Sequence, residues 1–157
     1  MERLDPILLV DAIAVFAAHE RHARPRTLAP ARFADARYAL LKRATVLGRL
    51  QKALPIETLR VRLDPADVAR LTYADGRSPS EWVEWVKAKR PQAYEHYDTL
   101  AHSPTPVAGP LLLAGQNDAS LVVYDGYHRV AAWWAHIERG QRYPIDANLV
   151  VTQLAPR

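Results

Sequence analysis

Residues 121–140, LVVYDGYHRVAAWWAHIERG, predict a strand, a tight glycine turn and a helix in direct succession. The apolar run Leu121–Tyr124 is typical of a strand, and Asp125-Gly126 breaks it. Apolar residues then recur from Val130 to Ile137 at the spacing of one helix face. Gly140 stands where a glycine commonly ends a helix. The stretch therefore defines a strand-turn-helix unit with well-marked boundaries.

The turn Asp125-Gly126-Tyr127-His128-Arg129 has the composition of an anion-binding site. Unpaired backbone N–H groups point outward at the positive end of the helix dipole, which favours bound phosphate. Gly126 allows close approach of a ligand, and the planar guanidinium of Arg129 suits phosphate oxygens. His128 can donate or accept at neutral pH, and Asp125 can orient a hydroxyl, hold a metal with the phosphate or act as a base. The predicted catalytic residues are Asp125 and His128, and the predicted nucleotide-binding residues are Gly126, Tyr127, His128 and Arg129.

Each of these residues also has a purely structural interpretation. Asp125 can cap the helix, and Arg129 can pair with an acidic neighbour. His128 can be a buried polar group with satisfied hydrogen bonds, and Tyr127 can simply pack. Their grouping at a strand-to-helix turn favours a site, because ligand-binding and catalytic residues concentrate where a rigid scaffold presents a turn.

Three further segments predict strands. Residues 58–63 alternate between apolar and polar side chains, as a half-buried strand requires. Residues 111–114 form a short apolar run, and the turn residues 115–118 separate it from the run 121–124, which predicts a hairpin. Residues 145–151 predict a last strand.

Helices are predicted between the first strand and the hairpin. Asp64-Pro65 opens a short helix that ends near Gly76. The sequence Ser78-Pro79-Ser80-Glu81 is a capping box that begins the next helix. Pro91 either kinks this helix or begins another that runs to Leu100.

Asp5-Pro6 predicts a first helix that continues to about Ala18, and a second, basic helix is predicted from 30 to 54. The expected fold is therefore α+β: a small mixed sheet of about four strands packed by helices, with a helical N-terminal extension. We expect the extension to span 1–54 and the sheet domain to span 55–157.

Composition limits the chemistry that the chain can perform. With 157 residues and 49% hydrophobic residues, it fits one well-packed folded domain. The absence of cysteine excludes disulfides, thiolate zinc sites and cysteine nucleophiles. Residues 1–62 carry twelve Lys and Arg against six Asp and Glu, whereas residues 63–157 carry nine against eleven. The basic N-terminal part suits either solvated helix faces or contact with a phosphate backbone.

The sequence around the turn resembles the ParB-like and sulfiredoxin superfamily, over about residues 55–152. Gly126 to Arg129 matches the G-x-x-R box of ParB-type CTP switches, and Asp125 to Arg129 matches the D-G-H-H-R of free-serine kinases except at Tyr127. Sulfiredoxins place a cysteine in this turn, so their activity is excluded here. The resemblance implies a nucleotide site. DNA clamps of this type also need a second polar box and a helix-turn-helix, so we do not expect DNA-clamp activity.

We therefore expect a nucleotide-binding ParB-like domain that binds ATP, ADP or CTP, with Mg²⁺ bridging the phosphates during phosphoryl transfer or hydrolysis. One alternative is a nucleic-acid-associated module that uses the basic N-terminal helices. Another is a partner-binding adaptor without catalytic activity. No dedicated metal site and no membrane span are expected, and the expected location is the cytoplasm.

Overall fold

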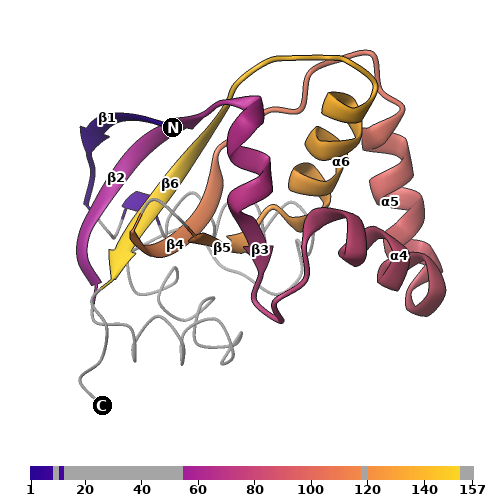
Figure 1. Cartoon of the computed structure of the whole chain (residues 1–157), viewed down its shortest axis with the longest axis horizontal. Coiled ribbons are helices and arrows are strands. Elements are labelled where there is room, and N and C mark those ends of the chain that lie inside the picture. Colours follow the sequence, from indigo (N-terminus) through magenta and orange to yellow (C-terminus); the bar gives the residue numbers. More distant parts are fainter. Residues whose placement is uncertain (9–10, 13–54, 118–119, 153–157) are drawn as a thin grey trace, which may run out of the picture.

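A mixed six-stranded sheet organises the part of the chain that the structure, a computed structural model, describes: residues 1–8, 11–12, 55–117 and 120–152 (Figure 1). The strands lie in the order β1-β2-β6-β4-β5-β3. Their bounds are β1 Glu2–Pro6, β2 Pro55–Leu63, β3 Leu71–Tyr73, β4 Leu111–Asn117, β5 Ser120–Asp125 and β6 Ile145–Thr152. The helices are the 3₁₀ helix η1 Pro65–Arg70 and the α-helices α4 Pro79–Lys89, α5 Pro91–Ala101 and α6 Tyr127–Glu138.

The α+β class is confirmed, but the expected number of strands was too small. The additional strands, β1 and β3, are the two edges of the sheet. β3 has three residues and pairs in parallel with β5, so it is too short to produce an alternating pattern in the sequence. The segment after Asp64 therefore forms a 3₁₀ helix and a strand, where one short helix was predicted.

The N-terminal segment begins with a strand, so the predicted helix start at Asp5-Pro6 is wrong. β1 pairs antiparallel with β2, and the Ile7 N–H continues this pairing by donating to the Thr58 carbonyl over 2.9 Å. Proline is tolerated here because β1 is an edge strand and Pro6 is its last residue. Residues 11–12 are helical, and the rest of the predicted N-terminal helices lies outside the described residues.

The other predicted elements are confirmed with small changes of boundary. β4 and β5 form the expected antiparallel hairpin, although Gly115 to Asn117 continue β4 where a turn was predicted. Ser78 and Glu81 form the predicted capping box of α4, and Pro91 begins α5. β6 pairs in parallel with β4 and antiparallel with β2, which places it in the centre of the sheet.

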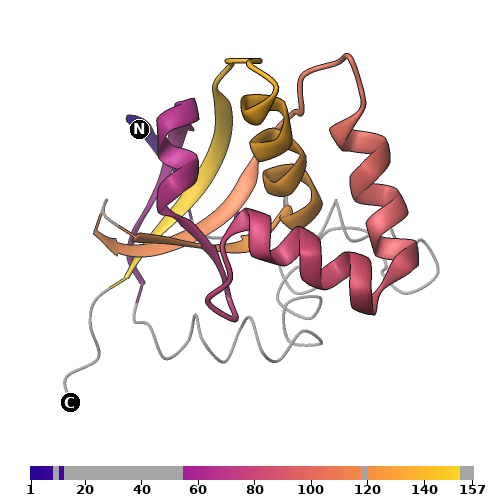
Figure 2. The ribbon, with the colours of Figure 1, turned by 45° about the vertical axis from the view of Figure 1, so that its right-hand side comes forward.

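One face of the sheet packs against α4, α5 and α6, which lie together on one side of it (Figures 1 and 2). This helix-covered face holds the main hydrophobic core. Residues at alternating positions of the strands, such as Val61, Leu113 and Val123, are fully buried in it together with Trp133 of α6. The alternation that predicted β2 therefore places Leu59, Val61 and Leu63 in this core.

The opposite face of the sheet carries a smaller apolar cluster. Its buried members in the described residues are Ala12, Leu112, Ala114, Tyr124 and Val150. Residues that follow β1 lie over this face, because Ala12 is buried in the cluster and Ile7 packs against it. β1 and these residues precede the expected domain boundary at residue 55 but contribute directly to the sheet and to its second face.

Candidate functional site

The turn between β5 and α6 depends on Gly126. Its φ of +92° lies in the left-handed region, and it is the N-cap residue of α6, where it has no side chain with which to cap the helix. A Cβ atom at this position would lie 2.6 Å from Leu111 Cδ2 and 3.0 Å from Arg129 Nη2. Glycine is therefore required both by the backbone conformation and by the side chains that close over it.

Arg129 lies across Gly126 and is held there by hydrogen bonds. Its Nη1 donates to the Pro110 carbonyl over 2.7 Å, and its Nη2 donates to Asp125 Oδ2 over 3.0 Å. The Asp125 and Arg129 side chains are only 17% and 19% exposed, so this ion pair is largely shielded from solvent. Burial lowers the pKa of Arg129 and Asp125 opposes that effect, and a guanidinium stays charged at physiological pH.

Tyr127 faces the helix layer and packs between aromatic rings. Its ring centroid lies 4.6 Å from that of Tyr73 and 6.3 Å from that of Trp82. The Tyr73 hydroxyl donates to the Tyr127 carbonyl over 2.9 Å, which fixes the first turn of α6 against β3. Tyr127 therefore packs against neighbouring aromatic side chains, which is the structural role that its sequence also allowed.

His128 also lies against the helices. Its ring centroid is 5.2 Å from Trp82 and 4.8 Å from His96. Burial, followed by the nearby His96, lowers the pKa of His128 to about 4, although the Ala93 carbonyl and Asp125 act in the opposite direction. Its Nε2 is buried and has no hydrogen-bond partner in the described part of the chain. His128 is therefore neutral at pH 7.

The five predicted site residues thus divide into two groups. Asp125, Gly126 and Arg129 come together at the end of β5, while Tyr127 and His128 pack toward α4 and α5. Arg129 pairs with an acidic neighbour, Asp125, as its structural interpretation predicted. This ion pair orients Arg129 at the start of α6. Asp125 binds the Arg129 side chain and is not the N-cap residue.

His136 is fully buried and, unlike His128, has hydrogen-bond partners at both ring nitrogens. The sequence did not single it out. Its Nε2 lies 3.2 Å from the Leu100 carbonyl, and its Nδ1 lies 2.7 Å from the Tyr143 hydroxyl. A carbonyl only accepts, so Nε2 carries the proton and Nδ1 accepts from Tyr143. The Tyr143 oxygen in turn accepts the Val107 N–H over 3.0 Å.

This network positions residues 107–110, the segment whose Pro110 carbonyl accepts a hydrogen bond from Arg129. Val107 is held by Tyr143, and three residues later the Pro110 carbonyl accepts from Arg129. The intervening Gly109 packs directly on β6, where an added Cβ would lie 2.2 Å from the Asp146 carbonyl oxygen. No local sequence pattern indicates these contacts, because they join segments that are far apart in the chain.

Among the residues that the structure describes, no three His, Asp or Glu side chains gather closely enough to hold a metal ion. In the same ranges, no helix is both long and apolar enough to cross a membrane. The basic helix predicted over 30–54 lies outside these ranges. Compared with models of known protein families, with curated proteins and with solved structures, the chain gives no match.

Proposed function

We propose that this chain is a nucleotide-binding domain of the ParB-like and sulfiredoxin-like type, which holds phosphate groups at the turn Asp125–Arg129. The observation that carries the proposal is the Arg129 guanidinium, which lies across the left-handed Gly126 at the start of α6. The order of elements supports the fold type: β5, the turn, α6, Gly140 and β6 follow one another as the resemblance implies.

The turn offers a phosphate three favourable features. The N-terminal end of α6 carries the positive end of the helix dipole. Gly126 has no side chain to obstruct approach to the backbone. Arg129 is already oriented by Pro110 and Asp125, so less conformational entropy is lost when it binds a phosphate oxygen.

Asp125 makes the expected binding depend on a divalent cation. A phosphate beside Arg129 also approaches the Asp125 carboxylate, and two anions at close range repel each other. Mg²⁺ commonly uses one or two carboxylates together with phosphate oxygens, and Asp125 is the carboxylate that the turn supplies. The ion would neutralise the phosphates and remove this repulsion.

The contacts favour Asp125 over His128 as the group that assists phosphoryl transfer or hydrolysis. Asp125 lies beside the guanidinium, whereas the His128 ring packs against Trp82 and His96. A histidine with a pKa near 4 is also a weak base at neutral pH. Most of the catalytic effect would come from positioning and charge stabilisation by Arg129.

The test is isothermal titration calorimetry of the full chain with ATP, ADP and CTP, each with and without Mg²⁺. We expect saturable binding of at least one nucleotide, strengthened at least tenfold by Mg²⁺. Arg129→Gln should weaken this binding more than tenfold. The control Arg77→Gln removes another arginine that pairs with an aspartate, Asp75, and should change affinity less than twofold.

Removing Arg129 leaves Asp125 partly buried without this cation, which can destabilise the fold. The double variant Asp125→Asn/Arg129→Gln replaces the ion pair with two neutral amides and keeps the variant folded for the same titration. Full nucleotide affinity in this double variant, or no binding of any nucleotide to the unaltered chain, would refute the proposal.

A further inference from the structure

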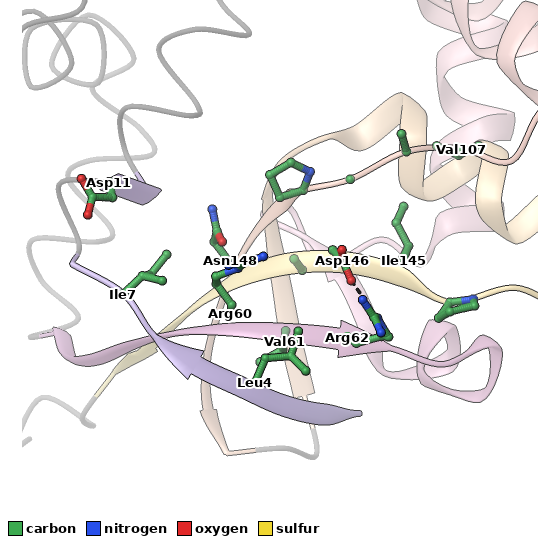
Figure 3. Close-up of a pocket in the computed structure, with 15 residues that line it drawn as sticks. Leu4, Ile7, Asp11, Arg60, Val61, Arg62, Val107, Ile145, Asp146 and Asn148 are labelled. Carbon is green, nitrogen blue, oxygen red and sulfur yellow. Dashed lines mark hydrogen bonds and ion pairs between the residues drawn. The ribbon is translucent and has the colours of Figure 1, made fainter.

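A cavity of about 640 Å³ opens on the second face of the sheet, away from α4, α5 and α6 (Figure 3). It lies between β1, β2, β6 and the segment 107–110. Its size falls within the range of small-molecule sites, which is roughly 300–1,000 Å³. Its apolar lining includes Leu4, Ile7, Pro110 and Pro144.

Two cross-strand pairs of β2 and β6 give the cavity its polar groups. Arg62 faces Asp146 in the register, and Arg60 faces Asn148. The first pair is closed, because Arg62 Nε donates to Asp146 Oδ1 over 3.0 Å. The second pair is open: within the described part of the chain, neither the Arg60 nor the Asn148 side chain has a hydrogen-bond or ion-pair partner. Figure 3 shows Asn148 near Arg60, and the bonded pair farther along the strands.

Asn148 is the informative member of the open pair. It is only 6% exposed, and it lines the cavity. Its amide offers donors and an acceptor to a ligand in the cavity. Together with the exposed guanidinium of Arg60, which supplies further donors, this amide favours a ligand with acceptor oxygens.

The charges along the cavity restrict that ligand further. Two arginines and two aspartates line it: Arg60, Arg62, Asp11 and Asp146. With Arg62 and Asp146 neutralising each other, a single guanidinium remains for an anion, and Asp11 disfavours a second negative charge. A doubly charged phosphate fits this balance less well than a carboxylate, which Arg60 can bind with two parallel hydrogen bonds.

We infer that this cavity binds a small monocarboxylate with an apolar body, its carboxylate on Arg60 and Asn148 and its apolar part against Leu4 and Ile7. The segment 107–110, which closes another side of the cavity, is firmly positioned. The Tyr143 hydroxyl holds the Val107 N–H, and Gly109 packs against the Asp146 backbone. The cavity lining does not include the turn Asp125–Arg129, although Pro110 borders the cavity and accepts a hydrogen bond from Arg129.

The test is a titration of the ¹⁵N-labelled full chain followed by NMR, with hexanoate as the probe. Hexanamide has the same chain without the charge, and hexyl phosphate has a phosphate in place of the carboxylate. We expect hexanoate to shift the Asn148 side-chain amide and the Arg60 backbone signals saturably, and to bind at least tenfold more tightly than either analogue. Arg60→Met should weaken hexanoate binding at least tenfold.

The control Arg77→Met removes the same charge on the other side of the sheet, at the turn before α4, and should change hexanoate affinity less than twofold. Asn148→Leu keeps the branched shape of the buried side chain and removes its hydrogen-bonding groups, and its unfolding midpoint in urea reports whether the sheet is intact. The inference is overturned by an unshifted Asn148 amide, by equal binding of hexanamide, by tighter binding of hexyl phosphate, or by an Arg60→Met variant that binds as well as the unaltered chain.

Discussion

The two faces of the sheet are built from the same strands but differ in chemistry. On the helix-covered face, Val61 of β2 and Leu149 of β6 are buried in the main core. On the second face, the alternate positions of the same strands carry Arg60 and Asn148, which border a cavity. Because side chains alternate along a strand, one short sequence can serve stability on one side and ligand binding on the other.

The turn Asp125–Arg129 lies where these two regions meet. Tyr127 and His128 belong to the packing of the helix-covered side. Arg129 reaches the other way, to the carbonyl of Pro110, a residue that also lines the cavity. Adjacent residues of one motif therefore contact different parts of the molecule: Tyr127 and His128 pack in the helix layer, whereas Arg129 bonds to the segment that borders the cavity.

The largest expected effect is a loss of stability that differs between two neighbouring leucines of β4. Leu113 is fully buried in the main core, and Leu112 is buried in the smaller cluster on the second face. Leu113→Ala should lower the free energy of unfolding by about 3–4 kcal/mol, and Leu112→Ala by about 2 kcal/mol, because the cost depends on the cavity left behind. Urea unfolding followed by circular dichroism measures both values under one condition. Equal losses would show that the two faces contribute alike to stability, and a larger loss for Leu112 would show that the second face contributes more.

A smaller effect is expected from acid, through His128. In the unfolded chain this histidine binds a proton near its ordinary pKa of 6.5, whereas in the folded chain its pKa is about 4, chiefly because of burial. Between these values the unfolded state binds more protons, so the stabilisation is complete above pH 6.5 and is lost as pH falls toward 4. Allowing for partial exposure of the ring, the loss is roughly 2 kcal/mol, and urea unfolding from pH 7 to pH 4 measures it.

Two variants isolate the contribution of His128 to this pH dependence. His128→Phe keeps an aromatic ring against Trp82 and removes the titrating group, so its stability should fall less between pH 6.5 and pH 4. His102→Gln removes an exposed histidine at the end of α5 and should leave the profile unchanged. A His128→Phe profile that is parallel to that of the unaltered chain would exclude His128 as the source.

Sequence reasoning succeeded where a feature is local. The strand, glycine turn and helix around Gly126 follow from neighbouring residues, as does the capping box of Ser78 and Glu81. It failed at the two edge strands, β1 and β3. Pro6 is compatible with a helix start as well as with an edge strand, and β3 is too short to show a period.

The directions of the side chains at the site could not be predicted from the sequence either. The D-G-x-H-R pattern predicts a turn, but it does not say that the His128 ring turns toward Trp82 while Arg129 turns toward Pro110. Likewise, the pairing of Arg60 with Asn148 depends on the register of strands that are distant in the chain. Such contacts are decided by tertiary packing, whereas the local pattern decides only the element.

The smallest stability effect is expected from the closed pair on the second face, and it separates stability from binding most clearly. Arg62 and Asp146 are 45% and 47% exposed, and exposed ion pairs contribute little to stability, so Asp146→Asn should leave the urea midpoint of unfolding nearly unchanged. Hexanoate should nevertheless bind about three- to tenfold more tightly to this variant, because the cavity loses a negative charge and Arg62 loses its ionic partner. The gain should shrink as salt is raised, since exposed charges are screened. An unchanged affinity would mean that the charge balance of the cavity does not select its ligand, whereas a gain without a change in stability would show that the second face is built for binding.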